Sequence, residues 1–225
     1  LYRTSLKGLT PERAMETVFS GNPWTTSFTE DCFGNIWIGT YRNGTFCFHK
    51  NQTPFQKSMS GKNIECMSTD HSGNYWIGSL NGEVCVLDST QKQIMGKTIF
   101  PNDMIHTICG QESSNKVWVG TMYGLYEAWI ESNKQIVYQK TSGINIPSIR
   151  SIVQDSCFLW IASYNNGVTL YNYSTQQSVV TYKTDSEVLP LPSNTIRTIL
   201  KDRENNLWVG TAEGLVVLNG KERFT

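Results

Sequence analysis

The chain has 225 residues, 39% of them hydrophobic and 17% charged, and this composition excludes an intrinsically disordered protein. Its 19 basic and 19 acidic side chains cancel, so the basic excess of a typical nucleic-acid-binding protein is absent. No apolar run approaches the ~20 residues that cross a bilayer, which predicts a soluble chain without membrane contact.

The sequence opens at Leu1 with no initiator methionine and no signal peptide, so we interpret it as a piece of a longer protein. Leu1–Leu6 and Ala14–Phe19 are predicted to be the third and fourth strands of an incomplete sheet, and Glu222–Thr225 the start of a last fourth strand. Between them no segment sustains helical periodicity, and β-branched and aromatic residues dominate the apolar runs. The sequence therefore predicts an all-β chain.

One unit recurs five times along the chain. Each copy has a first strand, a tight polar turn, a strand centred on tryptophan, a glycine-centred turn, a third strand and a more variable fourth strand. The first strands are Thr25–Asp31, Ile64–Asp70, Ile105–Gln111, Ile149–Asp155 and Ile196–Asp202. The tryptophans are Trp37, Trp76, Trp118, Trp160 and Trp208, with spacings of 39, 42, 42 and 48 residues. A period of roughly 40 residues that carries strands alone predicts the four-stranded antiparallel blades of a β-propeller.

We expect a single propeller segment over residues 1–225 with about five and a half blades. The expected bounds are a partial blade over 1–20 and blades over about 21–60, 61–101, 102–143, 144–188 and 189–225. Because both ends fall inside a blade, a part of a larger, seven-bladed ring is favoured over an open arc. The tryptophans are predicted to fill the wedges between sheets rather than to stack on a sugar or a nucleobase, since each occupies the same place in a central strand.

The turn and the tryptophan strand follow one pattern, Asp-(turn)-Gly-Asn-x-Trp-Ile-Gly-Thr, which resembles the two-component regulator propeller repeat. The first, second and fifth units match the pattern closely. The third unit departs from it, with Gln111 in place of the aspartate and Ser114 in place of the turn glycine. The fourth has a shorter turn and Ala162 in place of the glycine after tryptophan. The resemblance covers nearly the whole chain.

The resemblance implies a parent similar to the hybrid two-component sensor kinases of Bacteroidetes, in which propellers form the periplasmic sensor ahead of a membrane span and a kinase. Many such sensors respond to oligosaccharides. The implied role is a non-catalytic, periplasmic ligand-binding module of a parent anchored in the inner membrane. Its implied partners are an oligosaccharide or other small ligand, the remaining blades, a downstream sensor domain of the parent and a second copy in a homodimer.

Ligands of propellers usually bind at one mouth of the central channel, on loops that a rigid scaffold holds. If the first strand of each blade is innermost, its second residue lies near that mouth, and these residues are Thr26, Glu65, His106, Arg150 and Arg197. They vary in chemistry while the neighbouring columns stay apolar, which suits a binding site. The alternative is that they merely solvate a water-filled channel.

The loops after the tryptophan strands add aromatic and amide side chains to this mouth. Aromatic faces beside amides and arginines suit a neutral or acidic sugar, which offers CH groups for stacking and hydroxyls for hydrogen bonds. The alternative for any single tyrosine is that it caps a strand end or packs on the next blade. The predicted ligand-binding residues are Trp24, Tyr41, Arg42, Glu65, His106, Tyr123, Arg150, Tyr164, Asn165 and Arg197.

The sequence predicts no catalytic residue. Glu65 and His106 could form an acid–base pair, but nothing in the sequence marks either side chain as perturbed. A glycosidase needs two carboxylates facing one bond, and the expected mouth offers Glu65 with only Glu213 as a second acid. Two alternatives to a sensor remain open: a polysaccharide-degrading enzyme on a propeller scaffold, and an architectural arc whose parent binds its ligand elsewhere.

The six cysteines are Cys32, Cys47, Cys66, Cys85, Cys109 and Cys157. None forms a Cys-x-x-Cys pair and no histidine lies at metal-ligand spacing from them, so neither a metal site nor a cofactor is expected. Most of them fall in predicted strands, where cysteine packs as a small hydrophobic residue. Buried free thiols are therefore favoured over disulfides, although an oxidising compartment favours disulfides.

Overall fold

Antiparallel strands form every sheet of the computed structural model, and the described residues contain no helix. The structure describes residues 2–3, 16–17, 24–30, 35–42, 44–48, 56–58, 62–88, 98–101, 103–187 and 189–218. No helix in these ranges is therefore long and apolar enough to cross a membrane. The predicted strand at Glu222–Thr225 and the side chain of Cys32 lie outside the described residues.

Near the N-terminus, β1 (Tyr2–Arg3) pairs with β2 (Glu16–Thr17). The next two sheets are blade 1 and blade 2. Blade 1 consists of β3 (Thr25–Glu30), β4 (Ile36–Thr40), β5 (Gly44–Phe48) and β6 (Gln56–Ser58). Blade 2 consists of β7 (Ile64–Thr69), β8 (Tyr75–Ser79), β9 (Glu83–Leu87) and β10 (Thr98–Ile99).

Three further sheets follow the same strand order. Blade 3 consists of β11 (Ile105–Gly110), β12 (Val117–Thr121), β13 (Leu125–Ile130) and β14 (Ile136–Lys140). Blade 4 consists of β15 (Ile149–Asp155), β16 (Phe158–Ser163), β17 (Val168–Asn172) and β18 (Gln177–Tyr182). Blade 5 has β19 (Ile196–Lys201), β20 (Leu207–Thr211) and β21 (Gly214–Leu218) among the described residues.

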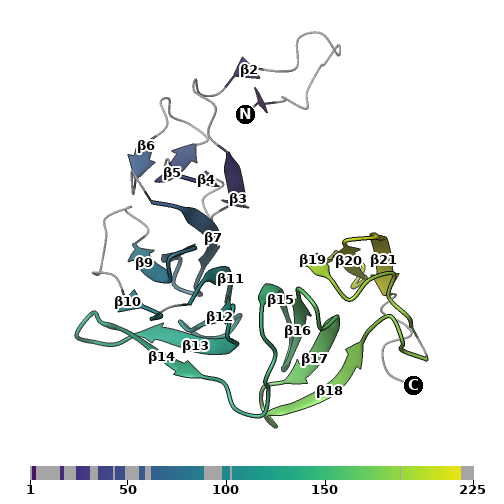
Figure 1. The fold of residues 1–225 in the computed structure, drawn as a ribbon. Helices are drawn as coiled ribbons and strands as arrows, with labels where there is room; N and C mark the ends of the chain where they lie inside the picture. The colour runs from purple at the N-terminus through teal and green to yellow at the C-terminus, as the bar shows by residue number, and fades with distance from the viewer. Residues whose placement is uncertain are drawn as a thin grey trace.

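The five blades lie one after another along an arc (Figure 1). Each is a meander in which strands adjacent in sequence pair with each other, so the first strand forms one edge of its sheet. The first strands β3, β7, β11, β15 and β19 contact one another in that order and line the inner side of the arc. The β-propeller architecture and the innermost position of the first strand are therefore confirmed.

In blades 1 to 4 the tryptophan packs on the face of the following sheet. Trp37 lies against Tyr75 with ring centroids 4.1 Å apart, and Trp76 belongs to a core cluster with Val117 and Val119 of blade 3. Trp118 packs in the same way on blade 4, and Trp160 on blade 5. These four side chains are at most 4% exposed, which confirms their structural role.

The fifth tryptophan departs from the prediction of a buried wedge. Trp208 is 37% exposed because no described strand covers its face of blade 5. Its cross-strand neighbours Leu200 and Val217 are exposed on the same face. The motif therefore determines the position of the tryptophan in its strand, whereas burial of its side chain requires a following blade.

The aspartate of the repeat explains the polar turn. Asp70 accepts hydrogen bonds from the backbone N–H groups of Ser72 (3.0 Å) and Asn74 (3.0 Å) and from Trp76 Nε1 (2.9 Å). Asp202 repeats this arrangement with Trp208 Nε1 at 2.8 Å. One carboxylate thus joins the turn to the tryptophan of the following strand.

The glycine two residues after the tryptophan is needed because the next blade closely approaches the backbone of the tryptophan strand. A Cβ on Gly78 would lie 2.5 Å from Ile105 Cγ2, and one on Gly120 would lie 2.6 Å from Ile149 Cγ2. In both cases the obstructing side chain begins the first strand of the next blade. The glycine therefore sets the spacing between neighbouring inner strands.

The cysteines behave as small core residues. Cys47, Cys66 and Cys85 are buried, and Cys109 and Cys157 are half-buried. Burial raises the pKa of the Cys109 thiol to about 11, so it stays protonated at neutral pH. The expected burial is confirmed for Cys47, Cys66 and Cys85.

Candidate functional site

The second residue of the first strand is a β-bulge in every blade. In blade 2, Ile64 pairs with Ser79 and Cys66 with Gly78, so Glu65 is left out of the ladder. The register shifts at the same position in the other blades. The residues left out are Thr26, Glu65, His106, Arg150 and Arg197. Bulges change the direction of side chains and are common beside functional sites. Here the bulge residues are the five residues at the second position of the first strand that the sequence predicts to line the mouth.

Four consecutive blades bring residues of this column and one loop tyrosine together. Arg150 Nη1 lies 3.1 Å from His106 Nδ1, which joins blade 4 to blade 3. The Arg150 guanidinium carbon lies 5.1 Å from the centroid of the Tyr164 ring, and that of Arg197 lies 5.2 Å from the same centroid. We call Glu65, His106, Arg150, Tyr164 and Arg197 the arginine cluster.

Tyr164 is held between the two arginines by the loops beside it. Its backbone N–H donates to the carbonyl of Ser148 at 3.0 Å, and Ser163 Oγ donates to the carbonyl of Pro147 at 2.8 Å. These two hydrogen bonds therefore attach the loop to the segment that leads into β15. Cation–π attraction to each guanidinium then orients the ring.

The histidine of the cluster is neutral at physiological pH. Burial, with Arg150 adding to it, lowers the pKa of His106 to about 4, and Asp103 opposes this shift. Because arginine can only donate, Nδ1 of His106 is the acceptor and the ring proton lies on Nε2. His106 therefore orients Arg150 and adds no charge to the site.

The acid of the cluster is weakened. Burial raises the pKa of the Glu65 carboxyl, and Arg150 opposes the rise. Both Glu65 and His106 are thus perturbed, which the sequence did not indicate. Arg150 also has a buried Nε without a hydrogen-bond partner among the described residues. The cluster has two guanidinium groups against one weakened acid, and the nearby Asp103 carboxylate accepts hydrogen bonds from backbone N–H groups. The two arginines therefore favour an anionic ligand group.

Three of the other predicted residues form a separate group on blade 1. The rings of Trp24 and Tyr41 stack with centroids 6.1 Å apart, and the Arg42 guanidinium lies 5.2 Å from the Tyr41 centroid. Trp24 is 73% exposed and accepts a hydrogen bond from the Tyr41 N–H through its carbonyl. This aromatic group leaves an exposed indole face available for stacking.

The two remaining predicted residues occupy different places. Tyr123 is exposed in the loop after β12. Asn165 follows Tyr164 and accepts a hydrogen bond from Thr195 Oγ1 at 3.3 Å, which ties blade 4 to the loop before β19. One residue near the site was missed: Asp103 is buried and accepts from the N–H groups of Met104 (2.8 Å) and Met122 (3.0 Å). Its place in a short loop before the third unit gives no sequence signal.

The described residues contain no group of three or more His, Cys, Asp or Glu side chains that could hold a metal ion. The fold and the arginine cluster define a β-propeller with a polar site on its inner bulges. Within this class, residues 190–213 match the family model of the two component regulator propeller. The resemblance stated from the repeats is thereby confirmed in blade 5, which keeps Asp202, Asn206, Trp208 and Gly210 of the pattern and has Asn205 in place of the turn glycine. No curated protein sequence matches the chain.

Several solved structures share the fold. The extracellular domain of the hybrid two component system BT3049 from B. thetaiotaomicron matches 94% of this chain and 29% of that chain, with 24% identity and a TM-score of 0.74. PorZ, a surface component of the type-IX secretion system of Porphyromonas gingivalis, matches 94% of this chain and 34% of that chain, with 16% identity and a TM-score of 0.70. This chain thus spans about a third of either protein.

A gluconolactonase of Xanthomonas campestris, XC5397, matches 91% of this chain and 75% of that chain, with 12% identity and a TM-score of 0.66. At these identities the likeness extends to the fold. Propeller blades of this shape therefore occur in a signalling protein, a secretion component and an enzyme, and function has to be argued from the site.

Proposed function

We propose that this chain is part of the ligand-binding propeller of a two-component sensor and that it binds a glycan-derived oligosaccharide with an acidic group. The observation that carries the proposal is the arginine cluster, in which two guanidinium groups flank the Tyr164 ring. Arginine binds carboxylates and sulfates in bidentate geometry, and the exposed aromatic faces suit sugar rings. The family match in blade 5 and the extracellular domain of BT3049 support the sensor role and an extracytoplasmic, periplasmic location.

The cluster suits binding better than catalysis. His106 has a pKa of about 4 and its Nδ1 accepts a hydrogen bond from Arg150, so it is a poor proton carrier at pH 7. The second acid considered, Glu213, is exposed in the loop after β20. We therefore infer a non-catalytic module. Binding across blades 2 to 5 would favour one arrangement of the parent, through contacts with its remaining blades, a downstream domain or a second copy.

The proposal is tested by calorimetry and thermal shift with matched pairs of neutral and uronic-acid-containing oligosaccharides. We expect acidic members to bind more tightly than their neutral partners. Arg197→Gln should weaken acidic ligands by at least about tenfold, because a charge-assisted hydrogen bond contributes roughly 1.5–3 kcal/mol. Tyr164→Ala should weaken both members of a pair, because the two guanidinium groups, which also donate to hydroxyls, lose the ring that orients them.

Arg203→Gln is the matched control, because Arg203 is an exposed arginine in the turn between β19 and β20. Trp24→Ala reports whether the aromatic group of blade 1 contributes to the same ligand. A ligand whose affinity is unchanged in Arg197→Gln and Tyr164→Ala would rule out the arginine cluster as its site. Release of shortened or oxidised sugar from any oligosaccharide would instead support the enzyme.

A further inference from the structure

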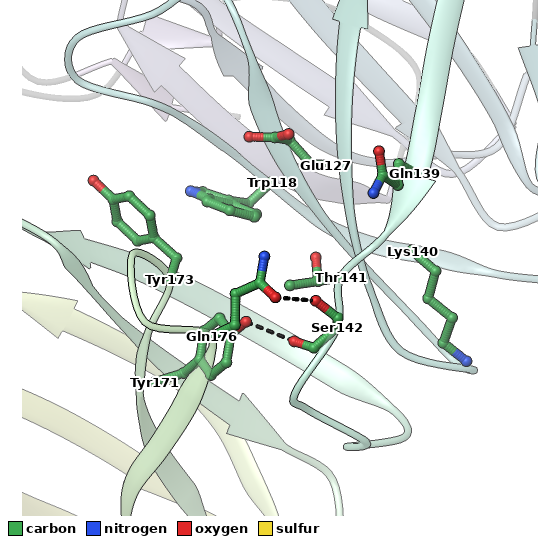
Figure 2. A pocket seen from close by; sticks show the side chains of 9 residues that line it. All are labelled: Trp118, Glu127, Gln139, Lys140, Thr141, Ser142, Tyr171, Tyr173 and Gln176. Atoms are coloured by element: carbon green, nitrogen blue, oxygen red, sulfur yellow. Dashed lines mark hydrogen bonds between the residues drawn. The ribbon is translucent and has the colours of Figure 1, made fainter.

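A polar cavity lies between blades 3 and 4, away from the arginine cluster (Figure 2). It has a volume of about 130 Å³ and is lined by residues of β12, β13 and β14, the loop after β14, and the end of β17 with the turn that follows. No residue of the arginine cluster lines it. A cavity of about 150 Å³ holds one benzene molecule, so this one matches a single small ring.

Comparison of two blades explains why the cavity exists. In blade 4, Tyr182 pairs with Val168, the first residue of β17, and its ring stacks on Trp160 with centroids 6.2 Å apart. In blade 3, Thr141 donates its N–H to the carbonyl of Leu125, the first residue of β13, at 2.9 Å and so holds the corresponding place. A threonine stands where a tyrosine ring covers the tryptophan in the next blade. The space of that ring is left open beside Trp118.

Two polar groups of the cavity wall are buried without a hydrogen-bond partner among the described residues: Thr141 Oγ1 and Trp118 Nε1. In blades 2 and 5 the repeat aspartate accepts from the tryptophan N–H. In blade 3 that aspartate is Gln111, whose amide instead bonds Glu127 at 2.8 Å and Ser114 at 2.7 Å. Buried unpaired polar groups are rare because each costs roughly 1–3 kcal/mol. Here both lie in the wall of the same cavity.

The remaining wall is held in place. Tyr171 donates from its hydroxyl to the carbonyl of Ser142 at 2.7 Å, and Ser142 Oγ donates to Gln176 Oε1 at 2.5 Å. These bonds join blade 3 to blade 4 and leave the Gln176 amide nitrogen directed toward Trp118 (Figure 2). Gly143 has φ of 68°, and a Cβ there would lie 1.8 Å from the carbonyl oxygen of Gln176. The two blades are therefore in direct backbone contact beside the cavity.

We propose that this cavity binds one neutral sugar ring, against the part of Trp118 that lines it and in the place that the Tyr182 ring takes in blade 4. The Trp118–Tyr173 pair, with centroids 5.4 Å apart, supplies the aromatic wall. Thr141 and the Gln176 amide supply hydrogen bonds for hydroxyls. The carboxylate of Glu127 also lines the cavity and pairs with Lys116 at 2.8 Å. Lys140 lines the cavity as well, but its ammonium group is directed away from Trp118 (Figure 2), so a ligand beside Trp118 meets the Glu127 carboxylate. The site thus complements the arginine cluster in charge and is independent of it.

The test follows the Trp118 indole N–H resonance in a ¹⁵N-labelled 225-residue chain, assigned by its loss in Trp118→Phe. The probes are glucose, galactose, mannose, xylose and N-acetylglucosamine, with glucuronate as the anionic counterpart. We expect at least one neutral sugar to shift this resonance saturably, with a Kd on the order of 1 mM for a ligand of this size. Thr141→Tyr should abolish the shift because its ring fills the cavity as Tyr182 does in blade 4.

Thr141→Val keeps the shape of the side chain and removes the hydroxyl. We expect it to weaken the sugar severalfold while the melting temperature of the free protein stays the same or rises, since an unpaired buried hydroxyl is lost. Thr184→Val, on an exposed loop, is the matched control. The proposal is wrong if no neutral sugar moves the Trp118 resonance, if Thr141→Tyr leaves the shift intact, or if glucuronate binds more tightly than glucose. A shift that survives Arg197→Gln separates this site from the arginine cluster, and one that is lost overturns their independence.

Discussion

At the scale of single residues, one carboxylate performs the same task in two environments. Asp70 and Asp202 each accept hydrogen bonds from a turn and from the indole of the next strand. Trp76 is fully buried, whereas Trp208 is 37% exposed. The hydrogen bonds are alike, but only the indole N–H of Trp208 can bond water instead when its aspartate is removed.

Asp70→Ala should therefore destabilise the protein more than Asp202→Ala. Loss of Asp70 leaves the Trp76 N–H unsatisfied in the core, and we expect the free energy of unfolding to fall by about 2–3 kcal/mol. In Asp202→Ala the Trp208 N–H is within reach of solvent, so the fall should be smaller. Urea unfolding followed by circular dichroism measures both values. Equal losses would show that the turn, rather than the indole, accounts for the effect.

Residue types in the sequence indicated the column of the site but not its geometry. Glu65, His106, Arg150 and Arg197 differ in chemistry although each follows an isoleucine, and the same four residues prove to be bulges. That Arg150 bonds His106 and shares Tyr164 with Arg197 depends on the distance between blades, which no spacing in the sequence encodes. The shifted pKa values of Glu65 and His106 follow from this packing and could not be read beforehand.

At the scale of strands and blades, the repeat predicted the structure most completely. The repeat period, the residues of the polar turn and the position of the tryptophan predicted the strand order of each blade. They could do so because strands that are adjacent in the sequence pair with each other. The cavity beside Trp118 was missed for the opposite reason. It depends on Thr141 and Tyr182 holding matching places in two blades, and the variable fourth strands give no sequence alignment from which to see this.

The glycine after tryptophan offers a test of how tightly the blades meet. A Cβ on Gly78 would lie 2.5 Å from Ile105 Cγ2 and 2.7 Å from Cys66 Sγ, whereas one on Gly210 would come no closer than 3.2 Å, to Thr198 Cγ2. We expect Gly78→Ala to cost about 1–3 kcal/mol through overpacking. Gly210→Ala should be near neutral because no described strand follows blade 5. Thermal unfolding of the two variants decides, and a larger loss in Gly210→Ala would contradict this view of blade packing.

At the scale of the whole molecule, the equivalent faces of blades 4 and 5 differ in what covers them. Trp160 and Leu170 of blade 4 pack on Ile199 and Val209 of blade 5. The equivalent face of blade 5 has no such cover among the described strands. It is formed by Leu200, Trp208, Leu215 and Val217, which are 63%, 37%, 62% and 41% exposed. These side chains lie on adjacent strands in register, so the arc carries a continuous apolar sheet face at this end.

An apolar sheet face of this kind favours association with another sheet. We therefore expect the 225-residue chain to self-associate in a concentration-dependent manner, which sedimentation velocity measures directly. Leu200→Glu with Leu215→Glu should raise the concentration at half-association at least about tenfold, because two charges would have to be buried in the interface. Val179→Glu is the matched control, since Val179 is 52% exposed on the outer strand of blade 4. Loss of association in the control as well, or in neither variant, would place the contact elsewhere; loss confined to blade 5 would mark this face as the one that a further blade or a second copy covers.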